Sequence, residues 1–344
     1  MAKITPKENF LKLRHGGTPE YVPFYSLMGA PYLGEVACAS ANVPLYNSTQ
    51  FQDGGKDLWG VPYAAASEGV ASTMPDNRII MLEDIYDWTK VVQFPKANDI
   101  DLDRVYQETL KKVDRSQSCL KVGPNFGPFQ QLVGFMGFEG ALCALYTEPE
   151  ECKALLNAMV DHLEPYFEPI AEAFQPDWWA MGDDTCAATT PFFSPEIYED
   201  VFLPIYKRLA APAQKRDIPV LFHNCGKIDE FIPFMIDYGV ELTEPSQEIN
   251  DLNALKEQFK GKISFAGGWG WGQHIPEGYP NNWDEEAFRQ DIRDTIDKWS
   301  KGGAYAFAGF PVGVRGDTEV DHVTEVMRDE AHWYGRKVYG YTED

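Results

Sequence analysis

The chain has 344 residues, of which 44% are hydrophobic, and this is enough to bury a large core. Its 53 acidic residues outnumber the 30 basic ones, and the net charge of -23 would repel nucleic-acid phosphates and anionic membrane surfaces. We therefore expect neither nucleic acid nor membrane as a partner.

The six cysteines are scattered along the chain without paired spacing, and no C-x-x-C motif occurs. This pattern is typical of reduced thiols in the cytosol rather than of a disulfide framework. The N-terminus also lacks the apolar stretch of a secretory signal. We therefore expect a cytoplasmic protein that is neither exported nor inserted in a bilayer.

Short apolar or β-branched runs alternate with segments of helical period, as is typical of parallel α/β folds. A capping box, T-P-K-E from Thr5 to Glu8, predicts a first short helix. Two later helices are predicted to start at T-E-P-E, residues 147–150, and at Ser194-Pro195. The expected strands are residues 21–26, 79–83, 119–123, 178–182, 220–225, 240–244, 263–267 and 304–309.

Eight strands separated by helices predict a (β/α)8 TIM barrel that occupies the whole chain, residues 1–344. A doubly wound open sheet is the alternative. Residues 1–78 would form an N-terminal extension around the first strand. The part from 29 to 77 has no clear period, so we expect either a lid or docking surface over the barrel mouth, or a structural cover.

In such a barrel the chemistry is expected where strands end at the C-terminal face. Two carboxylates, Asp183 and Asp184, end the fourth run and are candidate catalytic residues. Aromatic and amide side chains at the same rim would form an apolar pocket for a small molecule. The candidate substrate-binding residues are Tyr25, Asn125, Phe126, Phe129, Trp269 and Trp271.

The fifth run ends in V-L-F-H-N-C-G, in which His223 and Cys225 are two positions apart. Side chains at i and i+2 of a strand point to the same side, so both would face one cavity. An imidazole and a thiolate suit zinc, and Gly226 would let the chain turn away just past them. The motif predicts a metal site, and the alternative is that both residues serve only for packing.

Five segments between Met181 and Gly268 resemble the uroporphyrinogen decarboxylase superfamily, which includes corrinoid-linked methyltransferases. They are M-G-D-D, S-P-E-I-Y-E-D-V-F-L-P-I-Y-K-R-L, V-L-F-H-N-C-G-K-I, D-Y-G-V-E-L-T-E-P and I-S-F-A-G-G. The likeness extends over roughly residues 79–309. It implies a single (β/α)8 barrel, in agreement with the strand count.

Particular residues separate the branches of this superfamily. The decarboxylases carry an early arginine-rich segment, where this chain has S-L-M-G-A-P from Ser26 to Pro31. They also carry a histidine after the last strand, where this chain has Gly309-Phe310-Pro311. A substrate with many carboxylates needs such cations. Decarboxylation of uroporphyrinogen is therefore an alternative, and a catalytically silent barrel that only retains a ligand is another.

The zinc methyltransferase branch resembles this chain in H-x-C, which maps onto His223 and Cys225. Its members usually add a cysteine at the end of the last strand, and this chain has none there. Cobalamin-independent methionine synthases, a related barrel family, carry a glutamate ligand at the position of Glu244. The resemblance thus implies zinc bound by His223, Cys225 and Glu244 with a fourth position open, and it leaves Asp184 and Cys186 as reserve ligands.

The resemblance further implies methyl transfer from a small methylated compound, such as a methoxylated aromatic, to the Co(I) corrinoid of a partner protein. Zinc would act as a Lewis acid in this O-demethylase reaction, and Asp183 or Asp184 would hydrogen-bond or protonate the substrate. No D-x-H-x-x-G pattern of a corrinoid-binding module occurs, so a separate protein would carry the corrinoid. The barrel could also pair as a homodimer.

Overall fold

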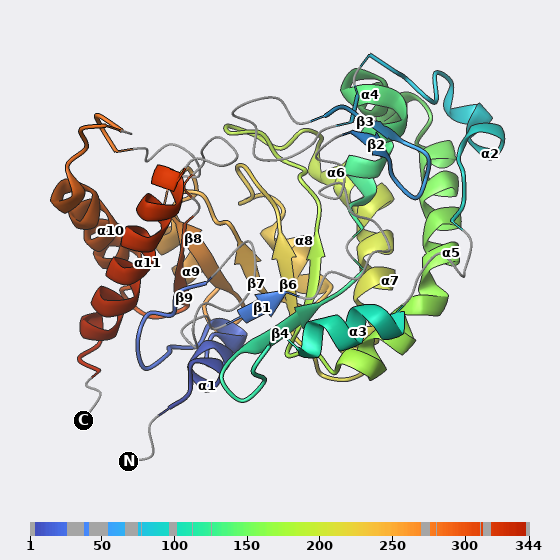
Figure 1. Cartoon of the computed structure of the whole chain (residues 1–344). Coiled ribbons are helices and arrows are strands. Elements are labelled where there is room, and N and C mark those ends of the chain that lie inside the picture. The colour runs from blue at the N-terminus through green and yellow to red at the C-terminus, as the bar shows by residue number, and fades with distance from the viewer. Residues whose placement is uncertain are drawn as a thin grey trace.

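A curled parallel sheet forms the centre of the molecule (Figure 1). The computed structural model describes residues 4–25, 38–40, 54–65, 75–76, 78–95, 102–111, 113–124, 126–269, 276–279, 281–309, 311 and 318–341. Within these residues the sheet has seven strands, and every neighbouring pair is parallel. In spatial order they are β1 (Cys38–Ser40), β4 (Cys119–Val122), β5 (Trp178–Gly182), β6 (Val220–His223), β7 (Val240–Glu244), β8 (Ser264–Gly268) and β9 (Tyr305–Ala308).

The first sheet segment of the chain lies against the last strand. Phe24 forms a parallel bridge with Phe307 of β9. The N–H of Tyr25 donates to the carbonyl of Phe307 at 2.8 Å, and the N–H of Phe307 donates to the carbonyl of Pro23 at 2.9 Å. This eighth segment lies beside β9 at one end of the curled sheet, and the fold is a (β/α)8 TIM barrel, as predicted.

Helices surround the barrel, with α5 packed against α7 on one flank and α10 against α11 on the other (Figure 1). The described helices are α1 (Pro6–Leu11), α2 (Trp88–Val91), α3 (Leu102–Leu110), α4 (Pro128–Thr147), α5 (Pro149–Phe174), α6 (Pro195–Ile197), α7 (Leu203–Gln214), α8 (Ile232–Asp237), α9 (Leu252–Gln258), α10 (Glu285–Trp299) and α11 (Thr318–Val338). A small hairpin, β2 (Gly55–Lys56) and β3 (Pro62–Tyr63), lies apart from the barrel sheet. Among the described residues, no helix combines the length and the apolar character needed to cross a bilayer.

Alternate residues of most strands face two different cores, because strand side chains point to opposite sides in turn. The start of β7 departs from this rule at a register shift, so that Val240 belongs to one cluster and Leu242 to the other. Val220 and Phe222 of β6 belong to the large core cluster beneath the helices. Leu221, between them, belongs to a second cluster that fills the barrel interior. The other members of this interior cluster are Phe10, Leu13, Tyr25, Cys119, Trp178, Leu242, Ala266, Ala306 and Ala308. Since Phe10 is part of α1, this helix closes the N-terminal end of the barrel.

The strand predictions are largely confirmed, but the strand predicted at residues 79–83 is wrong. The six later runs coincide with β4 to β9 to within two residues. Ile79 and Ile80, by contrast, are 50% and 41% exposed, and the N–H groups of Met81 and Leu82 donate to the carbonyl of Phe135 in α4. The strand beside β4 is instead β1, which comes from the predicted extension. An apolar run becomes a strand only where a neighbouring strand lies in reach of its backbone.

All three predicted helix starts are confirmed, because α1, α5 and α6 begin at Pro6, Pro149 and Pro195. The side chain of Thr5 accepts from the N–H of Glu8 at 3.1 Å, and the N–H of Thr5 donates to the Glu8 carboxylate at 2.9 Å. Ser194 caps α6 with its side chain. At residues 147–150 only the predicted cap is wrong: Thr147 is the last residue of α4, and Glu148 precedes α5 without a side-chain cap.

Gly226 turns the chain after Cys225, with a φ of +91° that favours glycine. A Cβ here would lie 2.5 Å from the carbonyl oxygen of Cys186, whereas a Cβ at Gly302, with a φ of +81°, meets nothing within 4 Å.

We expect Gly302→Ala to lower the free energy of unfolding by about 1 kcal/mol through backbone strain alone. Gly226→Ala should lose roughly 2 kcal/mol more, because the carbonyl must move. Urea unfolding followed by circular dichroism checks this, and equal losses in the two variants would contradict it.

Candidate metal centre

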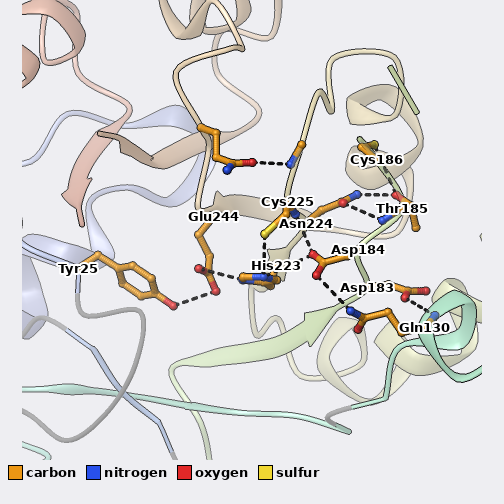
Figure 2. Close-up of polar contacts among 12 residues, drawn as sticks. Tyr25, Gln130, Asp183, Asp184, Thr185, Cys186, His223, Asn224, Cys225 and Glu244 are labelled. Atoms are coloured by element: carbon orange, nitrogen blue, oxygen red, sulfur yellow. Dashed lines mark hydrogen bonds and ion pairs between the residues drawn. The ribbon is translucent and has the colours of Figure 1, made fainter. Parts of the chain in front are cut away.

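Three potential ligands converge at the C-terminal end of β5 and β6 (Figure 2). His223 is the last residue of β6, Cys225 lies in the turn after it, and Asp184 follows β5. The Nε2 atom of His223 lies 3.5 Å from Sγ of Cys225 and 3.5 Å from Oδ1 of Asp184. One donor atom from each of these residues lies within 4.8 Å of the others, and each residue is partly exposed. The H-x-C motif therefore presents both side chains to one site, as its spacing predicts.

The two loops that carry these ligands are tied to each other. The N–H of Cys225 donates to Oδ1 of Asp184 at 2.9 Å. Asn224 lies between His223 and Cys225 in the chain and is buried. Its side chain accepts from the N–H of Thr185 at 3.1 Å and donates to the Thr185 hydroxyl at 2.7 Å. On the outer side, Gln130 of α4 donates to Oδ2 of Asp184 at 3.1 Å. These bonds hold the Asp184 carboxylate beside the His223 ring.

The donor set and its spacing fit a zinc ion. Imidazole nitrogen, thiolate sulfur and carboxylate oxygen are the zinc donors found in proteins. Zinc bond lengths and a tetrahedral angle place a nitrogen about 3.5 Å from a sulfur and about 3.4 Å from an oxygen of the same centre. The separations around Nε2 of His223 are both 3.5 Å. Both separations from His223 thus match the spacing of a zinc centre, and the donor atoms of Asp184 and Cys225 lie within 4.8 Å of each other.

Glu244, the last residue of β7, lies on the other side of the His223 ring. Its Oε2 atom is 3.2 Å from Nδ1 of His223, and it is not among the three residues whose donor atoms converge. The residue is only 3% exposed. Contact with Nδ1 places Glu244 where carboxylates that orient a metal-bound histidine are found.

Lys121 and Tyr25 complete the interior side of the site, and the sequence analysis did not single out Lys121. Lys121 is buried in β4, two residues after Cys119 of the interior cluster, so it also points into the barrel. Its Nζ donates to the hydroxyl of Tyr25 at 2.5 Å and lies 3.8 Å from Oε1 of Glu244. The Tyr25 hydroxyl donates to the same oxygen at 3.3 Å (Figure 2). A lysine in register with apolar interior positions was the signal that could have identified it.

The charged forms of His223 and Glu244 stabilise each other. Burial is the largest single effect and disfavours both charges of the pair, but the attraction between His223 and Glu244, together with the contributions of Cys225, Lys121 and Tyr25, outweighs it. The pKa of His223 is therefore raised well above its ordinary value, and the pKa of Glu244 is lowered, with Lys121 adding to the latter effect. Burial raises the pKa of the Cys225 thiol. The surroundings of Glu244 thus favour the ionised form of its carboxylate.

Asp183 faces away from the three converging ligands and holds α4. Its carboxylate accepts from the N–H groups of Phe129 and Gln130 at 2.7 and 3.0 Å, and from the hydroxyl of Tyr206 at 2.8 Å. The residue is 1% exposed, and burial raises its pKa to about 7, although these hydrogen bonds oppose the rise. Asp183 thereby fixes the start of α4, from which Gln130 reaches Asp184.

The aromatic side chains predicted to bind substrate are packed in the core where they are described. Phe129 contacts the rings of Phe192 and Phe193, among others. The indole of Trp269 donates to Asp291 at 2.8 Å, and the residue is 3% exposed. Phe126 is buried against Trp59, and Tyr25 binds Glu244. Asn125 and Trp271 lie outside the described residues, and substrate binding by this set stays a prediction.

Cys186, expected as a reserve ligand, does not join the three converging side chains. It is 4% exposed, its Sγ lies 3.7 Å from the hydroxyl of Thr185, and burial raises its pKa to about 12. Asp184, the other reserve residue, does join them.

The chain is similar in sequence to a known protein family and in fold to solved structures. A family model described as uroporphyrinogen decarboxylase (URO-D) matches residues 66–329. Among solved structures, a methyltransferase from Methanosarcina mazei is similar with a TM-score of 0.64 and 14% identity, over 95% of this chain and 99% of that chain. A putative vitamin-B12 independent methionine synthase from Listeria monocytogenes is similar with a TM-score of 0.38 and 12% identity, over 69% of this chain and 71% of that chain. At these identities the structural matches concern the fold. No curated protein matches the sequence significantly.

The two adjacent aspartates should differ in what their removal costs. Asp183→Ala leaves three donors without a partner in the core and should lower the free energy of unfolding by roughly 3 kcal/mol or more. Asp184→Ala, at a site that is one-third exposed, should cost only about 1 kcal/mol. Urea unfolding of both variants in a chelator, so that bound metal adds nothing, measures the difference. A loss for Asp184→Ala as large as for Asp183→Ala would contradict the assignment of Asp183 as the residue that holds α4.

Proposed function

Since the chain belongs to the uroporphyrinogen decarboxylase (URO-D) family, we propose that it is an enzyme of this family that transfers a methyl group. The methyl donor would be a small methylated compound, such as a methoxylated aromatic, and the acceptor the Co(I) corrinoid of a partner protein. The observation that carries the proposal is the zinc-like spacing of Asp184, His223 and Cys225 at the mouth of the barrel. The methyltransferase from Methanosarcina mazei shares this fold, and its name states the reaction class proposed here.

His223, Cys225 and Asp184 would hold the zinc, which would supply a Lewis acid for the heteroatom that carries the methyl group. This set differs from the one that the resemblance implies, because Glu244 contacts Nδ1 while Nε2 faces the other two ligands. We therefore propose that Glu244 orients the His223 ring and that Asp184 is the third ligand.

The remaining residues of the site would position the three proposed ligands and shield them. Asn224 and the N–H of Cys225 keep the two ligand loops together, and Gln130 occupies the outer oxygen of Asp184. Asp183 holds the start of α4 and, being buried, would act on the substrate only through Gln130. The proposed ligands thus lie at strand ends, and Gln130 at the start of a helix holds one of them, which is how a site keeps its geometry.

The proposed methyl transfer needs no reagent beyond the methyl donor, the Co(I) corrinoid and water. The bond between the methyl carbon and the substrate oxygen breaks, and both electrons stay on oxygen, which takes up a proton from water. The Co(I) corrinoid of the partner supplies the electron pair of the new bond to carbon. A phenolic oxygen is a poor leaving group unless its charge is stabilised, so the reaction needs the Lewis acid that the three ligands would hold.

Metal content is the direct test of the site. Protein purified without chelators should carry about one zinc per chain, and His223→Ala and Cys225→Ser should carry little, because each removes a ligand. Cys143→Ser, at an exposed cysteine of α4, is the matched control and should retain the metal. A metal-free wild type, or a Cys225→Ser variant that keeps its zinc, would overturn the proposed centre.

Methyl transfer can be followed with free cob(I)alamin as acceptor and a methoxybenzoate as donor. The zinc-loaded wild type should convert cob(I)alamin to methylcobalamin and release the phenol, and Cys225→Ser or treatment with a chelator should lower the rate by at least roughly 100-fold. The absorbance of the corrinoid and chromatography of the phenol report both products. Full activity in metal-free protein would contradict the mechanism, and turnover of a tetrapyrrole under the same metal-free conditions would favour decarboxylation instead.

A further inference from the structure

A buried lysine lies next to the proposed metal centre without touching any of its three ligands. Lys121 is 7% exposed and points into the barrel from β4. Its Nζ contacts the hydroxyl of Tyr25 and lies 4.9 Å from the centre of that ring. An ammonium group in such a place is costly unless an anion and hydrogen-bond acceptors compensate it. A tightly packed apolar side chain would avoid this cost, so the position of Lys121 needs an explanation from the site.

The carboxylate of Glu244 is shared between two sides of the barrel interior. Its Oε1 accepts from the Tyr25 hydroxyl at 3.3 Å and lies 3.8 Å from Nζ of Lys121. Its Oε2 lies 3.2 Å from Nδ1 of His223. With one oxygen held from each side, the carboxylate cannot rotate without losing a contact. The orientation of the His223 ring therefore depends on groups that the ring does not touch.

We propose that Lys121 and Tyr25 are positioning residues of the metal centre: they clamp Glu244 so that it holds His223 by Nδ1 and leaves Nε2 facing Cys225 and Asp184. This inference rests on the zinc site of the proposed function. It adds two residues, from the first sheet segment and from β4, to a site whose ligands come from β5 and β6. The clamp thereby connects the site across the interior of the barrel.

Charge balance agrees with this role. A zinc centre with Asp184, Cys225 and the adjacent Glu244 brings three negative charges together, and a divalent ion cancels two of them. Lys121 supplies the remaining positive charge beside Glu244. Without it, the buried carboxylate would keep an uncompensated charge and would be drawn toward the metal or toward water.

The clamp is tested by metal binding, with zinc affinity and the ligand-field spectrum of the Co²⁺-substituted protein as readouts. Lys121→Met and Tyr25→Phe should each weaken zinc binding by about 10- to 100-fold, as is typical when a partner of a metal-bound histidine is lost. Both should shift the Co²⁺ spectrum, and Lys121→Arg should restore part of the loss. Lys207→Met, at an exposed lysine of α7 paired with Asp237, is the control and should change neither readout.

A double-mutant cycle with Glu244→Gln asks whether Lys121 and Tyr25 act through that carboxylate. Once Glu244 is Gln, adding Tyr25→Phe or Lys121→Met should weaken zinc binding by less than twofold, because the clamped group is already gone. Full additivity would overturn the proposal. Tyr25→Phe removes one hydroxyl only, so it keeps the test valid if Lys121→Met fails to fold.

The outcomes separate this inference from the function on which it rests. Wild-type protein that binds neither zinc nor Co²⁺ would remove the proposed function and the inference together. Wild-type protein that binds both, with Lys121→Met and Tyr25→Phe folded and unchanged in affinity and spectrum, would remove the clamp alone. A variant Lys121→Met with unchanged metal binding but a raised KM for a methoxybenzoate would assign Lys121 to the substrate and would also overturn the clamp.

Discussion

The two-residue period of the barrel strands is the constraint on which the site depends. Apart from a register shift at the start of β7, the strands direct alternate residues to the barrel interior and the others to the helices. On β4, β6 and β7 the interior positions are apolar or small near α1 and become Lys121, His223 and Glu244 toward the carboxyl ends. The same alternation that fills the lower barrel with Leu221 and Leu242 therefore raises an imidazole and a carboxylate above them. A shift of one residue in register would turn all these groups toward the helices.

Polar groups in this position have to compensate one another, because the surrounding core is apolar. Glu244 is held between His223 and the pair of Lys121 and Tyr25, and Asp183 by two backbone N–H groups and a tyrosine hydroxyl. In a chain with a net charge of -23, a buried ammonium beside buried carboxylates is a local exception with a clear electrostatic reason. The partly exposed edge of this group, formed by Asp184, His223 and Cys225, is where a cation and a substrate would meet.

The start of α4 links the site to the helical shell. Asp183 accepts from the first N–H groups of this helix, where the helix dipole favours a negative charge. The next side chain, Gln130, donates to Asp184. Two neighbouring carboxylates thus have different tasks, one buried against a helix and one open to the mouth of the barrel. Their roles follow from surroundings that neither residue's type reveals.

Local patterns in the sequence determined a large part of this protein. The apolar runs determine β4 to β9, and the capping box determines the start of α1. The spacing of His223 and Cys225 places both side chains in the same site. All three features depend on residues close together in the chain. Only the tertiary structure decided that β1 rather than residues 79–83 lies beside β4, that Asp184 lies with His223 and Cys225 while Glu244 contacts Nδ1 of His223, and that Lys121 reaches Glu244. These outcomes depend on the register and burial of segments far apart in the chain, and side-chain distances between such segments are set by packing rather than by any local period.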